Sequence, residues 1–276
     1  MDFNAEDAEI IRSVEQDAWF DIFEAAPPAT ANRLEMKWER SEICGLLACR
    51  RVSAVAFNRA FAVGRKWASD PQDSHRCIEW VRRHGAPTWV VQIDPDGLRG
   101  PSLELSQHGL RETGQGWAKL LCPSPARPLD RPLDALVVRV SDDIGASVFA
   151  SLVCDGFGFP DEAFPWFRSL ALRPRWNAYL GHVRGQPVSA GAMYLNGKRA
   201  WLGVDTTLRP HRGQGLQAAL IHRRLEDCAR AGIEHAVAET GRPLETYDPS
   251  ESSYRNYVRS GFKPCYYSVN LGRPGG

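Results

Sequence analysis

The sequence predicts an α/β protein (α+β, with a mixed sheet) arranged in two similar halves. Three observations support this fold class. Strand-like runs rich in β-branched and aromatic residues alternate with helix-like runs along the chain. A turn with two glycines at 209–217 joins one such strand to one such helix. A proline-rich stretch at 123–132 separates two stretches that are each long enough for a domain.

Length and composition fit a globular protein and give no sign of a polyanionic or membrane partner. The chain has 276 residues, 43% of them hydrophobic and 24% charged, with a formal net charge of +1. That balance gives no reason to expect nucleic acid or an anionic membrane as partner. The acidic start at 1–7 lacks the apolar run of a secretory signal, and no stretch reaches the roughly 18 apolar residues of a membrane span. We therefore expect a cytoplasmic protein.

The number and spacing of the cysteines also favour the cytoplasm, where thiols stay reduced. They are odd in number and scattered, and none forms a Cys-x-x-Cys pair. Neither a disulfide framework nor a metal site is expected, and most of the thiols should be small buried hydrophobes. The seven are Cys44, Cys49, Cys77, Cys122, Cys154, Cys228 and Cys265.

The proline-rich stretch defines the predicted domain boundary. Prolines at this density cannot continue a helix or a central strand. We predict an N-terminal domain at 1–122, a linker at 123–134 and a C-terminal domain at 135–276.

The C-terminal domain opens with a strand at 135–140. A helix follows, capped by Ser141 or Asp142 and running to Cys154, and then an aromatic stretch at 155–167 that Gly and Pro break into a loop and a short helix. The remaining predicted elements are a hairpin around 184–186, a strand at 199–207, a helix at 216–231, a strand at 235–239, a helix at 252–260 and a last strand at 263–271.

The N-terminal domain repeats this plan in a degenerate form. Strands are predicted at 45–57, 61–64, 88–93 and 117–121, with helices at 75–84 and 101–108. The junction after Gly64, at 65–73, has no glycine turn, so this domain should lack a phosphate site. An unrelated α/β domain remains the alternative.

The glycine turn predicts a phosphate-bearing ligand. Gly213 and Gly215 let the backbone approach a ligand closely, and the first N–H groups of the following helix have no helical partner. Such a helix start attracts anions, and Arg212 adds a positive charge. His211 lies beside the turn, within reach of a phosphate or in solvent.

Three ligands compete for this turn. A nucleotide triphosphate is excluded because no Lys-Ser/Thr pair follows Gly215. A dinucleotide fits Gly-x-Gly-x-x-Ala, with Glu239 after the next strand, but polar residues at 209–212 separate the turn from its strand. Coenzyme A, whose pyrophosphate would lie on the same amides, is the third.

The turn resembles the acyl-CoA loop of the GCN5-related N-acetyltransferases, the GNAT superfamily. That loop reads Arg/Gln-x-x-Gly-x-Gly/Ala; here Arg212 and Gly215 match it, and Gln217 departs from its final residue. The segment at 254–262 resembles the family's Asn/Tyr-x-x-x-Gly-Phe helix end, and that at 177–193 its central hairpin.

The resemblance covers 135–271 in family order and implies the acyl-CoA N-acyltransferase (GNAT) fold, as two tandem GNAT-like domains of which the first is degenerate. It also implies acetyl-CoA as co-substrate, no metal, and a splayed pair of parallel strands at 200–207 and 235–239. The cofactor-binding residues it implies are Thr206, Thr207, Leu208, Arg212, Gly213, Gln214, Gly215, Leu216, Gln217 and Asn256.

The resemblance further implies a general acid at Tyr257, four residues before Gly261, with Tyr254 as the second choice. A phenol with an ordinary pKa of about 10 is protonated at neutral pH and can donate to a departing thiolate. Glu239 at a strand end is the first candidate for the base and Asp205 the second, although a water chain also serves in this family.

These expectations describe an acyl-CoA-dependent N-acyltransferase that acts by direct attack of a small-molecule amine or amino acid. Trp176, Trp201 and Phe167 are the candidates for an acceptor pocket, and core packing is the alternative for each. The rivals are an acyl-CoA-binding protein without catalysis and a nucleotide-dependent oxidoreductase. The sequence does not indicate the oligomeric state.

Overall fold

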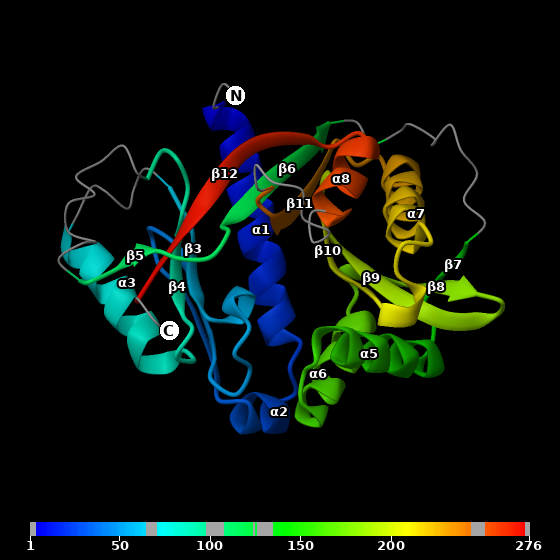
Figure 1. The fold of residues 1–276 in the computed structure, drawn as a ribbon, viewed down its shortest axis with the longest axis horizontal. Helices are drawn as coiled ribbons and strands as arrows, with labels where there is room; N and C mark the ends of the chain where they lie inside the picture. Colours follow the sequence, from blue (N-terminus) through cyan, green and yellow to red (C-terminus); the bar gives the residue numbers. More distant parts are fainter. Residues whose placement is uncertain are drawn as a thin grey trace.

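The computed structural model of the chain describes residues 4–64, 71–97, 108–123, 125, 135–243 and 252–273. Strands from both halves hydrogen-bond into one continuous mixed sheet, and helices cover both of its faces (Figure 1). The predicted α/β class with a mixed sheet is confirmed. Most of the predicted linker lies outside the described residues.

The N-terminal half contains strands at the predicted places and the first predicted helix, but the strand predicted at 45–57 ends at Cys49, and Val55–Phe57 form a 3-10 helix instead. One long helix at the start of the chain was not predicted. Its helices are α1 (Ala5–Glu24), α2 (Pro28–Arg33), the short 3-10 helix η1 (Val55–Phe57) and α3 (Pro71–His84). Its strands are β1 (Met36–Arg40), β2 (Gly45–Cys49), β3 (Arg59–Val63), β4 (Val90–Ile93), β5 (Arg111–Glu112) and β6 (Trp117–Pro123). The helix expected at 101–108 falls almost entirely outside the described residues.

The unpredicted helix α1 begins at a clear cap. The side chain of Asn4 accepts a hydrogen bond from the backbone N–H of Glu6 (3.0 Å). Ile11, Val14 and Ala18 recur at helical spacing and are buried. Because α1 contacts strands of both halves, it brings side chains from the start of the chain to the centre of the molecule (Figure 1).

The C-terminal half follows the predicted order closely. Its helices are α5 (Asp143–Phe157), the 3-10 helix η3 (Asp161–Ala163), α6 (Phe164–Ala171), the 3-10 helix η4 (Arg209–His211), α7 (Leu216–Arg230) and α8 (Ser252–Arg259). Its strands are β7 (Leu136–Arg139), β8 (Trp176–Val183), β9 (Gln186–Asn196), β10 (Arg199–Thr207), β11 (His235–Gly241) and β12 (Lys263–Gly272). Asp142 is the cap of α5, where it accepts from the N–H of Gly145 (2.7 Å).

The two halves exchange a strand. The sheet order is β1-β2-β3-β4-β12-β6-β11-β10-β9-β8-β7, with β5 beside β12. The last strand of the N-terminal half, β6, therefore pairs with β11, and the last strand of the chain, β12, pairs with β4 as well as β6. Figure 1 shows β12 and β6 crossing between the halves. The halves are consequently joined by backbone hydrogen bonds as well as by the linker.

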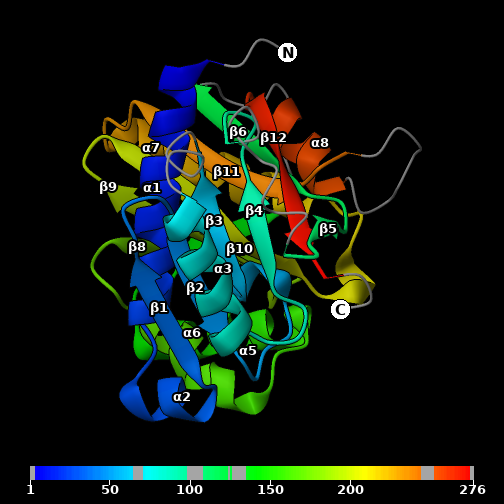
Figure 2. The same cartoon turned by 90° about the vertical axis from the view of Figure 1, so that its left-hand side faces the viewer.

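Helices on one face of the sheet share a core that spans both halves. Leu47 of β2 belongs to the core that contains α1, α5 and α6, whereas its neighbour Leu46 faces α3. Figure 2 shows α3 on the opposite side of the N-terminal strands from α1. On that opposite face α7 and α8 cover the C-terminal strands with a separate core. Six of the seven cysteines are buried, as predicted.

Candidate active site

The parallel strands β10 and β11 separate at the centre of the sheet. They pair only from Arg199↔His235 to Leu202↔Ala238, although β10 continues to Thr207 and β11 to Gly241. A bulge between Gly203 and Thr206, with Val204 at φ 56°, turns β10 away. The outer edges of these strand ends pair with β9 and β6, but the edges that face each other are not paired, which confirms the predicted splay.

The glycine turn follows the splayed end of β10. Gly213 and Gly215 have φ angles of 77° and 80°, in the left-handed region that glycine adopts without strain. Gly215 is the N-cap of α7, and no side chain of the described residues caps that helix start. A side chain at Gly213 would meet no described atom within 4 Å, so the approach to the turn is open. These features fit a diphosphate on the amides of the turn.

Side chains around the turn hold it in place. Arg212 Nε donates to the Thr207 carbonyl (3.0 Å), and Gln214 Nε2 donates to the Pro210 carbonyl (3.5 Å). The N–H of Leu208 donates to the Val188 carbonyl (3.0 Å). Leu216 is buried, so it anchors the first turn of α7.

The turn is tied to α8 through Gln217. Its Nε2 donates to Ser253 Oγ and its Oε1 accepts from Asn256 Nδ2, both at 2.9 Å. Asn256 is thus close to the turn, and Gln217 takes a bridging role where the family loop has a small residue. Ser189 Oγ donates to the Thr206 carbonyl (2.7 Å) and lies 2.8 Å from Thr207 Oγ1. His211 ends η4 and is partly exposed.

A cavity of about 400 Å³ opens at the splay, between the two halves. The C-terminal half lines it with Phe157, Phe159, Phe167, Trp201, residues 203–205 and 239–241, Ser253 and Tyr257. The N-terminal half lines it with Trp19, Ile22, residues 54–57 and Trp117. Both halves therefore build the cavity.

Tyr257, Asp205 and Arg224 form a chain at one side of this cavity. The Tyr257 hydroxyl donates to Asp205 Oδ2 (2.6 Å), and Asp205 Oδ1 lies 2.7 Å from Arg224 Nη1. Arg224 is fully buried and also donates to the Ala192 carbonyl (2.9 Å). Burial, together with the nearby Asp205 carboxylate, raises the pKa of Tyr257 well above its ordinary value, so the phenol stays protonated.

Tyr254, the second choice for the acid, lies elsewhere. Its hydroxyl is 3.2 Å from that of Tyr267, and it packs beside the core under α7 and α8. It is absent from the described lining of the cavity.

Glu239, on the wall of the cavity, is held by donors from the N-terminal half. Its carboxylate accepts from Trp19 Nε1 (2.8 Å), Arg59 Nη2 (2.9 Å) and Lys119 Nζ (2.8 Å). Burial opposes ionisation, but the two cations outweigh it and lower the pKa of Glu239 below its ordinary value. A carboxylate with a lowered pKa is a weak proton acceptor, which disfavours Glu239 as the general base.

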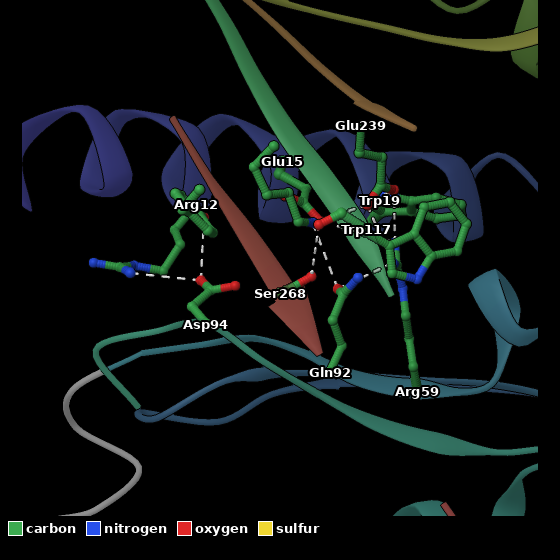
Figure 3. Close-up of polar contacts among 11 residues, drawn as sticks. Arg12, Glu15, Trp19, Arg59, Gln92, Asp94, Trp117, Glu239 and Ser268 are labelled. Carbon is green, nitrogen blue, oxygen red and sulfur yellow. Dashed lines mark hydrogen bonds and ion pairs between the residues drawn. The ribbon is translucent and has the colours of Figure 1, made fainter. Parts of the chain in front are cut away.

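The donors of Glu239 belong to a buried polar network between α1 and strand β6 (Figure 3). Lys119 also binds Glu15, and Arg59 Nη1 donates to Gln92 Oε1 (3.0 Å). The network places two acidic side chains and two cations in the interior, where pairing offsets part of the cost of burying charge. Burial and the nearby Glu239 raise the pKa of Glu15 to about 8.

This raised pKa predicts a pH-dependent stability. The folded state binds the Glu15 proton more tightly than the unfolded state, so the contribution is complete below pH 4.5 and is lost as pH rises through about 8. Glu15→Gln cannot titrate. Relative to the variant, the parent should lose up to about 1.4 kcal/mol of unfolding free energy per pH unit inside this window. Urea unfolding at pH 5.5, 6.5 and 7.5 measures the difference, and parallel profiles would contradict the assignment.

The predicted acceptor residues divide between cavity and core. Trp201 and Phe167 line the cavity. Trp176 is absent from the described lining; it is buried and its indole N–H donates to Asp21 Oδ1 (2.8 Å). Trp19, Phe57 and Trp117 were not predicted, because each comes from the other half of the chain. For Trp19, the helical spacing of the apolar residues in α1 was a local signal that could have predicted the helix that carries it.

The described residues hold no arrangement of three or more His, Cys, Asp or Glu side chains suited to a metal ion. Within the same part of the chain, no helix is both long and apolar enough to cross a membrane.

Comparison with known proteins identifies the fold. No protein-family model matches the sequence, and no curated protein does. Among solved structures, a GCN5-related N-acetyltransferase from Sphaerobacter thermophilus aligns with a TM-score of 0.58 and 19% identity over 79% of this chain and 73% of its own. One from Kribbella flavida aligns with a TM-score of 0.50 and 20% identity over 75% and 77%.

A functionally unknown conserved protein from Staphylococcus epidermidis aligns with a TM-score of 0.55 and 12% identity, over 90% of this chain and 98% of its own. These alignments exceed what the C-terminal half alone supplies, since 135–276 is only about half of the chain. The chain has the acyl-CoA N-acyltransferase fold of the GCN5-related N-acetyltransferases, which confirms the resemblance at the level of the fold.

Proposed function

We propose that this protein is an acyl-CoA-dependent N-acyltransferase that transfers an acetyl group from acetyl-CoA to a small-molecule amine. One observation carries the proposal: the uncapped glycine turn follows the splayed end of β10, and Gln217 of the turn donates to Ser253 of the cavity that Tyr257 lines. A diphosphate on the turn would leave the pantetheine arm free to follow the splayed strand ends. The thioester would then reach the cavity.

The roles of the side chains follow from their contacts. The attacking amine forms a bond to the thioester carbonyl carbon, the C–S bond breaks, and the departing thiolate needs a proton. We assign that proton to Tyr257, because it lines the cavity and its hydroxyl is hydrogen-bonded to Asp205. Asp205 orients the hydroxyl and accepts the proton of the amine in preference to Glu239. Among the described residues, Asp205 pairs with one cation, Arg224, whereas Glu239 pairs with two, Arg59 and Lys119.

The geometry also weighs against the dinucleotide alternative. The short helix η4 (Arg209–His211) stands between the end of β10 and Gly213. A dinucleotide fingerprint needs its first glycine directly after the strand. A measurement of acyl transfer separates the proposed enzyme from the alternative, an acyl-CoA-binding protein without catalysis.

Release of free thiol from acetyl-CoA in the presence of a panel of amines tests the proposal. We expect amine-dependent thiol release and a product whose mass is increased by one acetyl group. Binding of acetyl-CoA without transfer to any amine would make this a binding protein. Absence of binding would overturn the proposal altogether.

The single glycine turn predicts the binding stoichiometry. Of the two halves, only the C-terminal one carries the glycine motif, because the segment after Gly64 has none. Titration calorimetry with acetyl-CoA should therefore give one site per chain. Two sites per chain would show that the N-terminal half is not degenerate.

A further inference from the structure

The cavity has a rigid aromatic wall that the proposed reaction does not by itself require. Phe159 stacks on Phe157 (ring centroids 5.3 Å apart, planes at 14°) and on Phe167 (5.5 Å, 9°). Phe57, from the other half, meets Phe159 edge-on at 5.4 Å. Phe57, Phe159 and Phe167 hold one another, so this part of the wall is already shaped before a guest enters, and Phe157 lies at its exposed rim.

Tryptophans complete the wall on the side of α1. Trp19 lies 5.7 Å from Trp201 in an edge-to-face arrangement. Among the described residues, the indole nitrogens of Trp201 and Trp117 are buried without a hydrogen-bond partner. Buried donors of this kind are normally satisfied by water or by a bound molecule. Both indoles belong to residues of the cavity lining, so they are polar groups at the cavity that lack a partner within the described part of the chain.

The acidic side chains face the cavity, and the cations that pair with them lie behind the lining. Glu239 and Asp205 lie on the lining, with 5% and 10% of their side chains exposed. The cations that pair with them, Arg59, Lys119 and Arg224, are buried and lie outside the described lining. Glu239 is already paired with two cations, so a guest meets Asp205, for which one cation partner is found among the described residues, and aromatic rings; both attract a single ammonium group.

We propose that the acetyl acceptor is a primary amine carried on a compact aromatic body. This inference rests on the acyltransferase function proposed above and names its substrate class. Because Phe157 and Phe167 already stack on Phe159, the aromatic body meets these rings edge to face, and the amine lies towards Asp205 and Tyr257. A cavity of about 400 Å³ is small among ligand pockets, which range from about 300 to 1,000 Å³. The lining offers a polyamine no second carboxylate free of cations, because Arg59 and Lys119 already pair with Glu239, so each additional ammonium group would lose its hydration without an ion-pair partner.

A set of matched amines tests this class directly. The probes are 2-phenylethylamine, its saturated analogue 2-cyclohexylethylamine, and spermidine, each with acetyl-CoA and thiol detection. We expect kcat/KM for 2-phenylethylamine to exceed that for spermidine by at least about 100-fold. We expect the saturated analogue to fall between the two. Equal or better use of spermidine would overturn the proposal, as would acetyl-CoA binding without transfer to 2-phenylethylamine.

A variant that fills part of the cavity tests where the amine binds. Ala56→Phe adds a ring to the lining contributed by the N-terminal half. It should lower kcat/KM for 2-phenylethylamine by about 10-fold or more while leaving acetyl-CoA affinity nearly unchanged. Ser53→Phe is the matched control, since Ser53 is exposed on the same loop and outside the described lining. An equal effect of the two substitutions would contradict the placement.

Two measurements keep the outcomes separate. The melting temperature of the Ala56→Phe variant shows whether it folds. In the parent, quenching of tryptophan emission by 2-phenylethylamine measures binding of the amine, because three tryptophans line the cavity. If the parent protein does not bind acetyl-CoA, the acyltransferase function is refuted. Intact acetyl-CoA binding without quenching by the aromatic amine would refute only the substrate class.

Discussion

Tyr257→Phe should lower turnover by about 10²- to 10⁴-fold, the usual contribution of general acid catalysis. The substitution keeps the ring, which packs edge-on against Phe262 at 5.0 Å, and removes only the hydroxyl that donates to Asp205. The affinity for acetyl-CoA should change little, because the proton matters only as the thiolate leaves. Steady-state kinetics with calorimetry separates the two effects.

Tyr254→Phe is the control for this prediction. Its hydroxyl faces that of Tyr267 and is absent from the described lining, so turnover should hardly change. If Tyr254→Phe were the damaging variant and Tyr257→Phe the silent one, the assignment of the acid would be reversed. If both were silent, a water molecule would be the donor.

Gly215→Val should weaken acetyl-CoA binding by roughly 100-fold, equivalent to one or two hydrogen bonds between a charged group and a backbone amide. Gly215 has a φ of 80°, which a β-branched residue adopts only under strain, so the substitution would distort the turn whose amides receive the ligand. Titration calorimetry measures the affinity.

A second glycine in the left-handed region supplies the matched control. Gly232 follows the opposite end of α7 with a φ of 68° and no described atom within 4 Å of an added side chain. Gly232→Val should therefore cost similar backbone strain while acetyl-CoA binding is retained. Equal loss of binding in both variants would mean that the effect comes from destabilised folding rather than from the turn.

The elements of the C-terminal half were predictable because their signals are local. Asp142 caps α5, Arg184 and Gly185 have the positive φ angles of a tight hairpin turn, and the glycine turn precedes α7. Each of these is set within a few residues. The same approach did not predict α1, although Asn4 and the spacing of its buried residues were present in the sequence.

Strand exchange and the partners of the site residues were not predictable in this way. Nothing in the alternation of β6 or β12 specifies whether its neighbour is β4 or β11, because pairing depends on the whole sheet. The sequence placed Glu239 at a strand end, but its partners Arg59 and Lys119 are 180 and 120 residues away. Because of those contacts, Glu239, which was the first candidate for the base, is a charge-paired residue of the cavity lining.

The central claim is that the turn at 212–217 binds an acyl-CoA, and calorimetric titration of the protein with acetyl-CoA, NAD, NADP and ATP tests it most directly. We predict that acetyl-CoA binds at one site per chain and that the other three show no saturable binding. Saturable binding of NAD or NADP, with none for acetyl-CoA, would contradict the claim.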